Sequence, residues 1–169
     1  ASRLSDVGGD KLTIAHRIDE AQVKALQASF SGKSGGNDAG DNAGNGTGNS
    51  KVDVVVFSAP QLSLYELRAL AQLCDGQRFT IPLLAVTSPQ VKPDADRFGY
   101  TERIEAAGGT VYSGMCFYQS YAREIAEANG WKRLATNSAK MVNILGGYGY
   151  VPMLASMEQC VQAAQTGRL

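Results

Sequence analysis

The stretch Val52-Asp-Val-Val-Val-Phe57 is followed by Ser63-Leu-Tyr-Glu66, and these two segments decide the fold class. A continuous apolar run is typical of a strand that is buried on both faces of a parallel sheet. The Ser-x-x-Glu spacing is a capping box, which predicts that a helix begins at this serine. That helix carries its apolar side chains on one face and is expected to end at Asp75-Gly76. A buried strand joined to an amphipathic helix is the repeating unit of an α/β fold.

The alternation of strand and helix continues to the end of the chain. Further strands are expected at residues 81–86, 110–112 and 134–136, and further helices at residues 94–107, 118–129 and 153–165. Gly99 is a weak point within the helix at 94–107. Strands that alternate with helices imply right-handed crossovers. We therefore expect an α/β fold with a largely parallel sheet and helices on both of its faces.

The first fifty residues have a different character. Residues 1–30 are expected to form a strand and a helix that continue a domain begun elsewhere, because the chain starts at Ala1 without a methionine. Residues 31–50 contain no large apolar side chain, so burial cannot offset the entropy of ordering them. They are expected to form a flexible insertion rich in Gly and Asn, followed by the α/β domain at 51–169. Gly32-Lys-Ser34 lacks the upstream glycine of a phosphate-binding loop.

Composition excludes several classes of protein. The chain is 44% hydrophobic and 19% charged, and its 169 residues suit one ordinary core. Sixteen basic residues balance sixteen acidic ones, so no net field attracts nucleic acid or an anionic membrane surface. No apolar run approaches the roughly 20 residues that span a bilayer. We therefore expect a cytoplasmic protein that has neither nucleic acid nor a membrane as its partner.

Polar loops follow three of the predicted strands, at residues 58–63, 113–117 and 136–140. Open parallel sheets bind their ligands beyond the carboxyl ends of the strands. Each loop comes directly after a β-prone run and precedes a helix or a Gly-rich turn. The residues after the strand at 81–86, Thr87 and Ser88, are less distinctive. The three loops are therefore the expected position of a binding site.

Lys140 is the candidate for binding a substrate carboxylate. Asn137 and Ser138 stand beside it and would add hydrogen bonds. The alternative is a solvated surface lysine, and spacing alone does not separate the two. His16 lies far in sequence from the loops, so a Ser-His-Asp or His-metal mechanism confined to this chain is not expected.

The three cysteines are too widely spaced for a disulfide framework or a CxxC metal pair, and reduced thiols are expected. Cys116 lies near the start of the predicted helix at 118–129, where the helix dipole favours a thiolate. It would ligate iron, act as a nucleophile, or be an inert thiol. Cys74 and Cys160 fall on the apolar faces of predicted helices, and packing is the expected role of both.

Taken in order, these features resemble the C-terminal part of the catalytic, large-subunit region of the aconitase X family. Ala59-Pro-Gln-Leu-Ser63 is similar to a Cys-Pro-His-Leu-Ser turn that precedes a Leu-Tyr-Glu-Leu helix. Residues 107–116 match an Ala-Gly-Gly strand and a Cys-containing loop, and Cys160-Val-Gln-Ala-Ala164 matches a closing helix. The sharpest feature is Thr136-Asn-Ser-Ala-Lys140.

This resemblance implies a dehydratase of a small hydroxy acid such as cis-3-hydroxy-L-proline, in a family that also includes a mevalonate-phosphate dehydratase. It implies an iron or iron–sulfur centre that acts as a Lewis acid on the leaving hydroxyl. The remainder of the catalytic region and a small swivel domain or subunit would be partners, so this chain alone would be inactive. The implied catalytic residues are Ser138 and Lys140, the implied substrate-binding residues are Ser58, Ser63, Thr136, Asn137, Ser138 and Lys140, and the implied metal ligand is Cys116.

The sequence departs from the family pattern at the positions that matter for a metal. Ala59 and Gln61 stand where the pattern has Cys and His, and Val142-Asn143 stands where Ala-His is common. Cys116 is the one matching thiol, so the centre is smaller, differently ligated or absent. The alternative function is that of a cluster-free relative that acts as an isomerase or a structural subunit. A nucleotide-binding domain fits less well, because no strand is followed by a GxGxxG or Walker loop.

Overall fold

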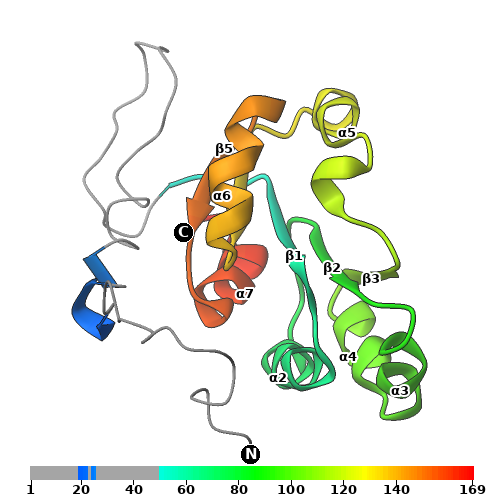
Figure 1. Cartoon of the computed structure of the whole chain (residues 1–169). Helices are drawn as coiled ribbons and strands as arrows, with labels where there is room; N and C mark the ends of the chain where they lie inside the picture. Colours follow the sequence, from blue (N-terminus) through cyan, green and yellow to red (C-terminus); the bar gives the residue numbers. More distant parts are fainter. Residues whose placement is uncertain (1–18, 23, 26–49) are drawn as a thin grey trace, which may run out of the picture.

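The structure, a computed structural model, describes residues 19–22, 24–25 and 50–169. Residues 50–169 contain one parallel sheet with the strand order β3-β2-β1-β4-β5 (Figure 1). The strands are β1 (Val54–Leu62), β2 (Leu83–Thr87), β3 (Gly109–Ser113), β4 (Arg133–Thr136) and β5 (Val151–Leu154). The α/β class and the parallel sheet are confirmed. The strand expected near residue 12 and almost all of the expected insertion, residues 31–49, lie outside the described residues.

One or two helices follow each strand in sequence, and helices cover both faces of the sheet (Figure 1). They are α2 (Leu64–Cys74), α3 (Lys92–Arg97), α4 (Tyr100–Ala106), α5 (Ala122–Asn129), α6 (Ala139–Leu145) and α7 (Met157–Thr166), together with the 3-10 helices η2 (Phe117–Gln119) and η3 (Gly146–Tyr148). In the part of the chain that the structure describes, no helix is long and apolar enough to cross a bilayer.

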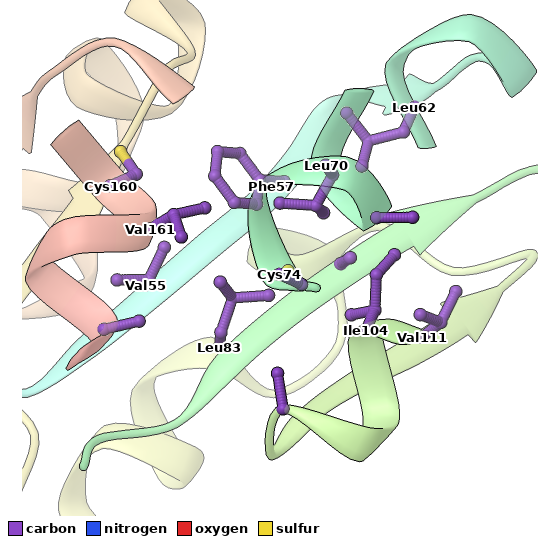
Figure 2. Packing of buried hydrophobic residues seen from close by; sticks show 14 of the residues in the cluster. Val55, Phe57, Leu62, Leu70, Cys74, Leu83, Ile104, Val111, Cys160 and Val161 are labelled. Carbon is purple, nitrogen blue, oxygen red and sulfur yellow. The ribbon is translucent and has the colours of Figure 1, made fainter. Parts of the chain in front are cut away.

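The core has two halves because β1 is buried on both sides. Val55 and Phe57 point into one apolar cluster, which α2, α3, α4 and α7 complete (Figure 2). Val54 and Val56 point into the other, which η2, α5 and α6 complete. These four side chains have no exposed surface. The continuous apolar run therefore marks the central strand of a three-layer α/β/α domain, as its composition predicts.

The start of α2 is the predicted capping box. The side chain of Ser63 accepts a hydrogen bond from the backbone N–H of Glu66, and the Glu66 carboxylate accepts one from the N–H of Ser63 at 2.8 Å. The helix ends at the predicted Asp75-Gly76, where Gly76 has a φ of 68°. Cys74, in the last turn, is packed in the first cluster with Cys160 from α7, as expected for both thiols (Figure 2).

Two expected helices are interrupted. The helix expected at residues 94–107 is split into α3 and α4 at Gly99, which has a φ of 71°. The helix expected at 118–129 begins as η2 and continues as α5 only from Ala122, because Tyr121 between them has a φ of 58°. Cys116 therefore precedes a three-residue 3-10 helix from an extended backbone position, so the prediction that it starts an α-helix is wrong.

Two elements differ from the sequence prediction near the end of the chain. The helix expected at 153–165 begins only at Met157, because Val151–Leu154 forms the edge strand β5 beside β4. Pro152 is tolerated there, since an edge strand leaves some N–H positions unpaired. The segment after Thr136 is not simply a loop and a Gly-rich turn, because α6 occupies 139–145 and buries Met141 and Leu145 one turn apart.

Candidate functional site

The strand order creates a topological switch point between β1 and β4. From β1 the chain proceeds outward to β2 and β3, then crosses back and adds β4 and β5 on the other side of β1 (Figure 1). Connections that leave two neighbouring strands in opposite directions open a crevice at their carboxyl ends, which is where such sheets bind ligands. Of the three predicted segments, the one at 58–63 forms the carboxyl end of β1, and the one at 136–140 runs from the last residue of β4 into α6.

Ser138 joins these two segments. Its hydroxyl donates a hydrogen bond to the carbonyl oxygen of Ala59 and accepts one from the N–H of Met141 at 3.2 Å, as the N-cap of α6. The hydroxyl of Thr136 accepts the N–H of Ser138 at 3.2 Å. The start of α6 is therefore fixed to the end of β1.

The third segment, at 113–117, is held to β1 on both sides of Cys116. The amide nitrogen of Gln61 donates to the carbonyl oxygen of Met115 at 2.8 Å. The hydroxyl of Ser58 accepts the N–H of Phe117 at 3.0 Å. The structure thus brings all three predicted segments together around the carboxyl end of β1, which itself stays extended to Leu62 rather than ending at Phe57.

The predicted substrate-binding residues fall into two groups. Ser58, Thr136 and Ser138 are buried, and their hydroxyls are engaged by the protein itself. Asn137 and Lys140 are exposed. Ser63 is also exposed, but its hydroxyl lies within the capping box and contacts the Glu66 carboxylate at 2.7 Å. Substrate contact is therefore open to Asn137 and Lys140, while the buried hydroxyls set the shape of the loops.

The sequence did not indicate the environment of Lys140. The ammonium nitrogen of Lys140 lies 5.6 Å from the centroid of the Tyr118 ring, on η2. Among residues 19–22, 24–25 and 50–169, no carboxylate forms an ion pair with this lysine. The contact joins two segments on different elements, and no motif or periodicity connects the two residues.

The donor set at these loops does not fit an iron–sulfur cluster by itself. The described residues contain no group of three or more His, Cys, Asp or Glu side chains that could hold a metal ion. Cys116 is a partly buried free thiol, whereas a cubane cluster needs three or four thiolates. Burial raises the pKa of Cys74 and of Cys160 to about 12, so both are neutral thiols at physiological pH.

Two surface hollows lie away from these loops. One, of about 490 Å³, is lined by the C-terminal end of α2 and by α4, and the other, of about 510 Å³, lies over α3 and α4. The first hollow includes Ala106 and Ala107, which shortly precede β3, and so it lies near the amino edge of the sheet. Neither hollow includes a residue of the three predicted segments.

Comparison with known proteins identifies similar chains. The family described as the aconitase X third domain matches residues 52–166. The phosphomevalonate dehydratase large subunit of Thermococcus kodakarensis is 32% identical over 150 residues, which is 87% of this chain and 33% of that protein. The subunit of the same name from Methanocaldococcus jannaschii is 36% identical over 88 residues, 52% of this chain and 21% of that protein.

A solved structure is similar as well. The crystal structure of Thermococcus kodakaraensis aconitase X in its holo-form has a TM-score of 0.66 and 27% identity, and the match covers 87% of this chain and 33% of that one. The chain thus spans about a third or less of the length of the relatives it matches.

Proposed function

This chain belongs to the aconitase X family, and from that premise we propose that it is one domain of the large subunit of a heteromeric hydro-lyase. The enzyme would remove water from a small hydroxy acid. The similar curated proteins are large subunits of phosphomevalonate dehydratases, which supports both the reaction class and the need for a partner subunit. One partner would be the remainder of the large subunit, because the chain spans about a third or less of the length of its relatives. The other would be a smaller, swivel-like subunit, because the relatives are named as large subunits.

One observation carries the proposal for the site. Lys140 is exposed at the switch point, where the carboxyl end of β1 meets the segments that follow β3 and β4. No carboxylate among the described residues forms an ion pair with it. A substrate carboxylate that enters a closing site unpaired costs several kcal/mol, so a cation must meet it. We assign that role to Lys140, and a hydrogen bond to the carboxylate to the side-chain amide of Asn137.

The same contact would assist the chemistry. Dehydration breaks the bond between carbon and the hydroxyl oxygen and takes a proton from the carbon beside it. When that proton lies next to the carboxylate, negative charge moves onto the carboxylate oxygens as the proton leaves. An ammonium group held there stabilises the charge more in the transition state than in the ground state. Ser138, predicted to be catalytic, would act by positioning Asn137 and Lys140, since its proton is donated to Ala59.

Two substrates are to be tested. The relatives' name makes phosphomevalonate the first, and the sequence resemblance makes cis-3-hydroxy-L-proline the second. Both are small hydroxylated carboxylates, and the proposed role of Lys140 is the same for each.

The test compares Lys140→Met with Lys132→Met in the complete enzyme. The enzyme is purified by an affinity tag on this chain, so that its partner subunits are recovered with it. Lys132 lies just before β4, at the opposite end of the same strand, and so controls for the loss of an exposed lysine. Lys140→Met should lower kcat/KM for dehydration about 10- to 150-fold, which corresponds to the roughly 1.5–3 kcal/mol of a hydrogen bond to a charged group. Unchanged kcat/KM in Lys140→Met would show that this lysine does not bind substrate.

A second function, that of a cluster-free relative acting as an isomerase or a structural subunit, is favoured by one observation. Cys116 offers a single thiol, and Ala59 and Gln61 are not metal ligands of the kind a cluster requires. Measurement of iron and acid-labile sulfide in the purified assembly separates the two functions. If iron is present, Cys116→Ser should lower its content, because we propose this thiol as the one ligand that the chain contributes.

A further inference from the structure

We propose that Tyr118 is a positioning residue for Lys140, which holds the ammonium group at the switch point so that it can meet an anion. This inference rests on the proposed function, in which Lys140 binds the substrate carboxylate. It adds a residue of the segment after β3 to a binding role that otherwise belongs to the segment after β4. Nothing in the sequence pattern assigns a role to this tyrosine.

The geometry is that of a cation–π contact. The ammonium nitrogen of Lys140 is 5.6 Å from the centroid of the Tyr118 ring, inside the roughly 6 Å within which such contacts are attractive. Lysine has a long flexible stem, and an exposed lysine without a partner samples many rotamers. A ring at this distance favours the rotamers that place the charge beside η2.

The ring itself is held in place by its neighbours. Phe117, the preceding residue, is 2% exposed, and its N–H is bound by the Ser58 hydroxyl at 3.0 Å. Its ring lies 5.9 Å from that of Tyr150, whose hydroxyl donates to the carbonyl oxygen of Ala122 at 2.9 Å. Tyr118 packs against the same apolar cluster. The end of β1 and the start of α5 thus fix the element that carries the ring.

An aromatic partner suits a lysine that has to bind an anion. A carboxylate beside Lys140 would neutralise the charge and compete with an incoming substrate. A tyrosine ring attracts the ammonium group through its quadrupole and leaves the full positive charge available. Within the described residues Lys140 has the ring contact and no ion pair, which is the arrangement such a role requires.

The experiment uses the complete enzyme with Tyr118→Leu and Tyr118→Phe. The Phe variant keeps the ring, whereas the Leu variant keeps apolar packing and removes the ring. Tyr148→Leu is the matched control, because Tyr148 is also half-buried and packs against the same cluster. Each variant is made with Lys140 and with Lys140→Met. Lysines are labelled by reductive ¹³C-methylation, and the affinity for phosphomevalonate and for cis-3-hydroxy-L-proline is measured by calorimetry.

Two results are expected. The methyl resonance of Lys140 is identified by its absence in Lys140→Met. The ring should shift this resonance upfield in the wild type and in Tyr118→Phe. In Tyr118→Leu its chemical shift should move toward the values of the other exposed lysines. Substrate affinity should fall about two- to five-fold in Tyr118→Leu, the range for an exposed cation–π contact, and should be retained in Tyr118→Phe and in Tyr148→Leu. In the Lys140→Met background the effect of Tyr118→Leu should disappear, because the ring would have no ammonium group to position.

Other results overturn the inference in distinguishable ways. If Lys140→Met weakens binding and Tyr118→Leu does not, the proposed function stands and the positioning role is wrong. A loss in Tyr118→Leu that persists in the Lys140→Met background shows a general structural effect and also refutes the role. If Lys140→Met binds both substrates as well as the wild type does, the proposed function and the binding role of the tyrosine both fail. The methyl resonance then reports only whether the ring contact exists.

Discussion

Ser138→Ala should destabilise the domain more than the loss of a helix cap explains. The Ser138 hydroxyl caps α6 through the Met141 N–H and also donates to the carbonyl oxygen of Ala59. Both Ser138 and Ala59 are buried, at 7% and 4% exposure. The substitution removes an N-cap, worth about 1 kcal/mol, and leaves a buried carbonyl without its partner, which costs about 1–3 kcal/mol. The expected decrease in the free energy of unfolding is therefore about 2–4 kcal/mol.

The matched control is Ser156→Ala at the start of α7. The Ser156 hydroxyl accepts the N–H of Gln159 at 3.2 Å, the same distance as in the cap of α6, but Ser156 is exposed and its capping bond is local. Its loss should cost about 0.5–2 kcal/mol, the range for a cap alone. The difference between the two variants isolates the bond between β1 and the segment after β4.

The assay is urea unfolding followed by circular dichroism, with the slope of free energy against urea compared between variants. A decrease of 2–4 kcal/mol corresponds to a melting temperature lower by roughly 4–16 °C in a domain of this size. If Ser138→Ala and Ser156→Ala destabilise equally, then the bond to Ala59 contributes nothing, and the two segments are not held together as we argue.

Two further predictions concern the packing of the sheet. Gly109→Ala should destabilise the domain by about 1–3 kcal/mol in urea unfolding, because an added Cβ would lie 2.8 Å from the Cγ2 atom of Ile104. The control is Gly147→Ala, which should be nearly neutral because no atom lies within 4 Å of its added Cβ. Equal effects of the two substitutions would contradict the close contact at Gly109. Burial raises the pKa of the Cys74 and Cys160 thiols from 9.0 to about 12, so the folded chain retains protons that the unfolded chain releases, and stability should fall as pH rises from about 9 toward 12. Melting temperatures of a Cys74→Ala and Cys160→Ala double variant should depend less on pH over that range, and an unchanged slope would show that these thiols are not the groups that titrate.

The fold was predictable where the signals are local and strong. The run from Val52 to Phe57 cannot be placed on a solvated face, and the Ser63–Glu66 spacing marks a helix start whatever lies around it. Gly99 also acts locally, because its positive φ ends one helix and begins another. Such features depend on a few neighbouring residues, so one sequence suffices to find them.

The elements that were wrong depend on distant contacts. β5 is a four-residue strand that contains Pro152, and it is a strand because β4 lies beside it. The break at Tyr121 places a bulky residue in the left-handed region, which propensity disfavours for a non-glycine residue. Tertiary packing decides both, and a single sequence does not show which segments will become neighbours.

The candidate site was found in outline for a topological reason, and its internal organisation was not. Loops after parallel strands gather at one edge by construction, so their positions in the sequence suffice to group them. The bond between Ser138 and Ala59 joins residues 79 positions apart, and the Tyr118 ring lies on a different element from Lys140. The sequence therefore grouped the polar residues correctly, but it gave buried hydroxyls and exposed groups the same predicted role.

The division between buried and exposed polar groups also bears on our proposal that the domain works within a larger enzyme. Lys140 is the one cation in the three segments at 58–63, 113–117 and 136–140. A single ammonium group can meet one carboxylate, but a phosphorylated hydroxy acid carries charge at two ends, and its phosphate would stay unpaired against these segments. The buried hydroxyls in these segments are already engaged: those of Ser58 and Ser138 join β1 to its neighbours, and that of Thr136 accepts the N–H of Ser138. For a phosphorylated substrate, these three segments therefore suit one wall of a binding site. The remaining cations of that site would come from other parts of the assembly, as we propose for a domain of a larger, heteromeric dehydratase.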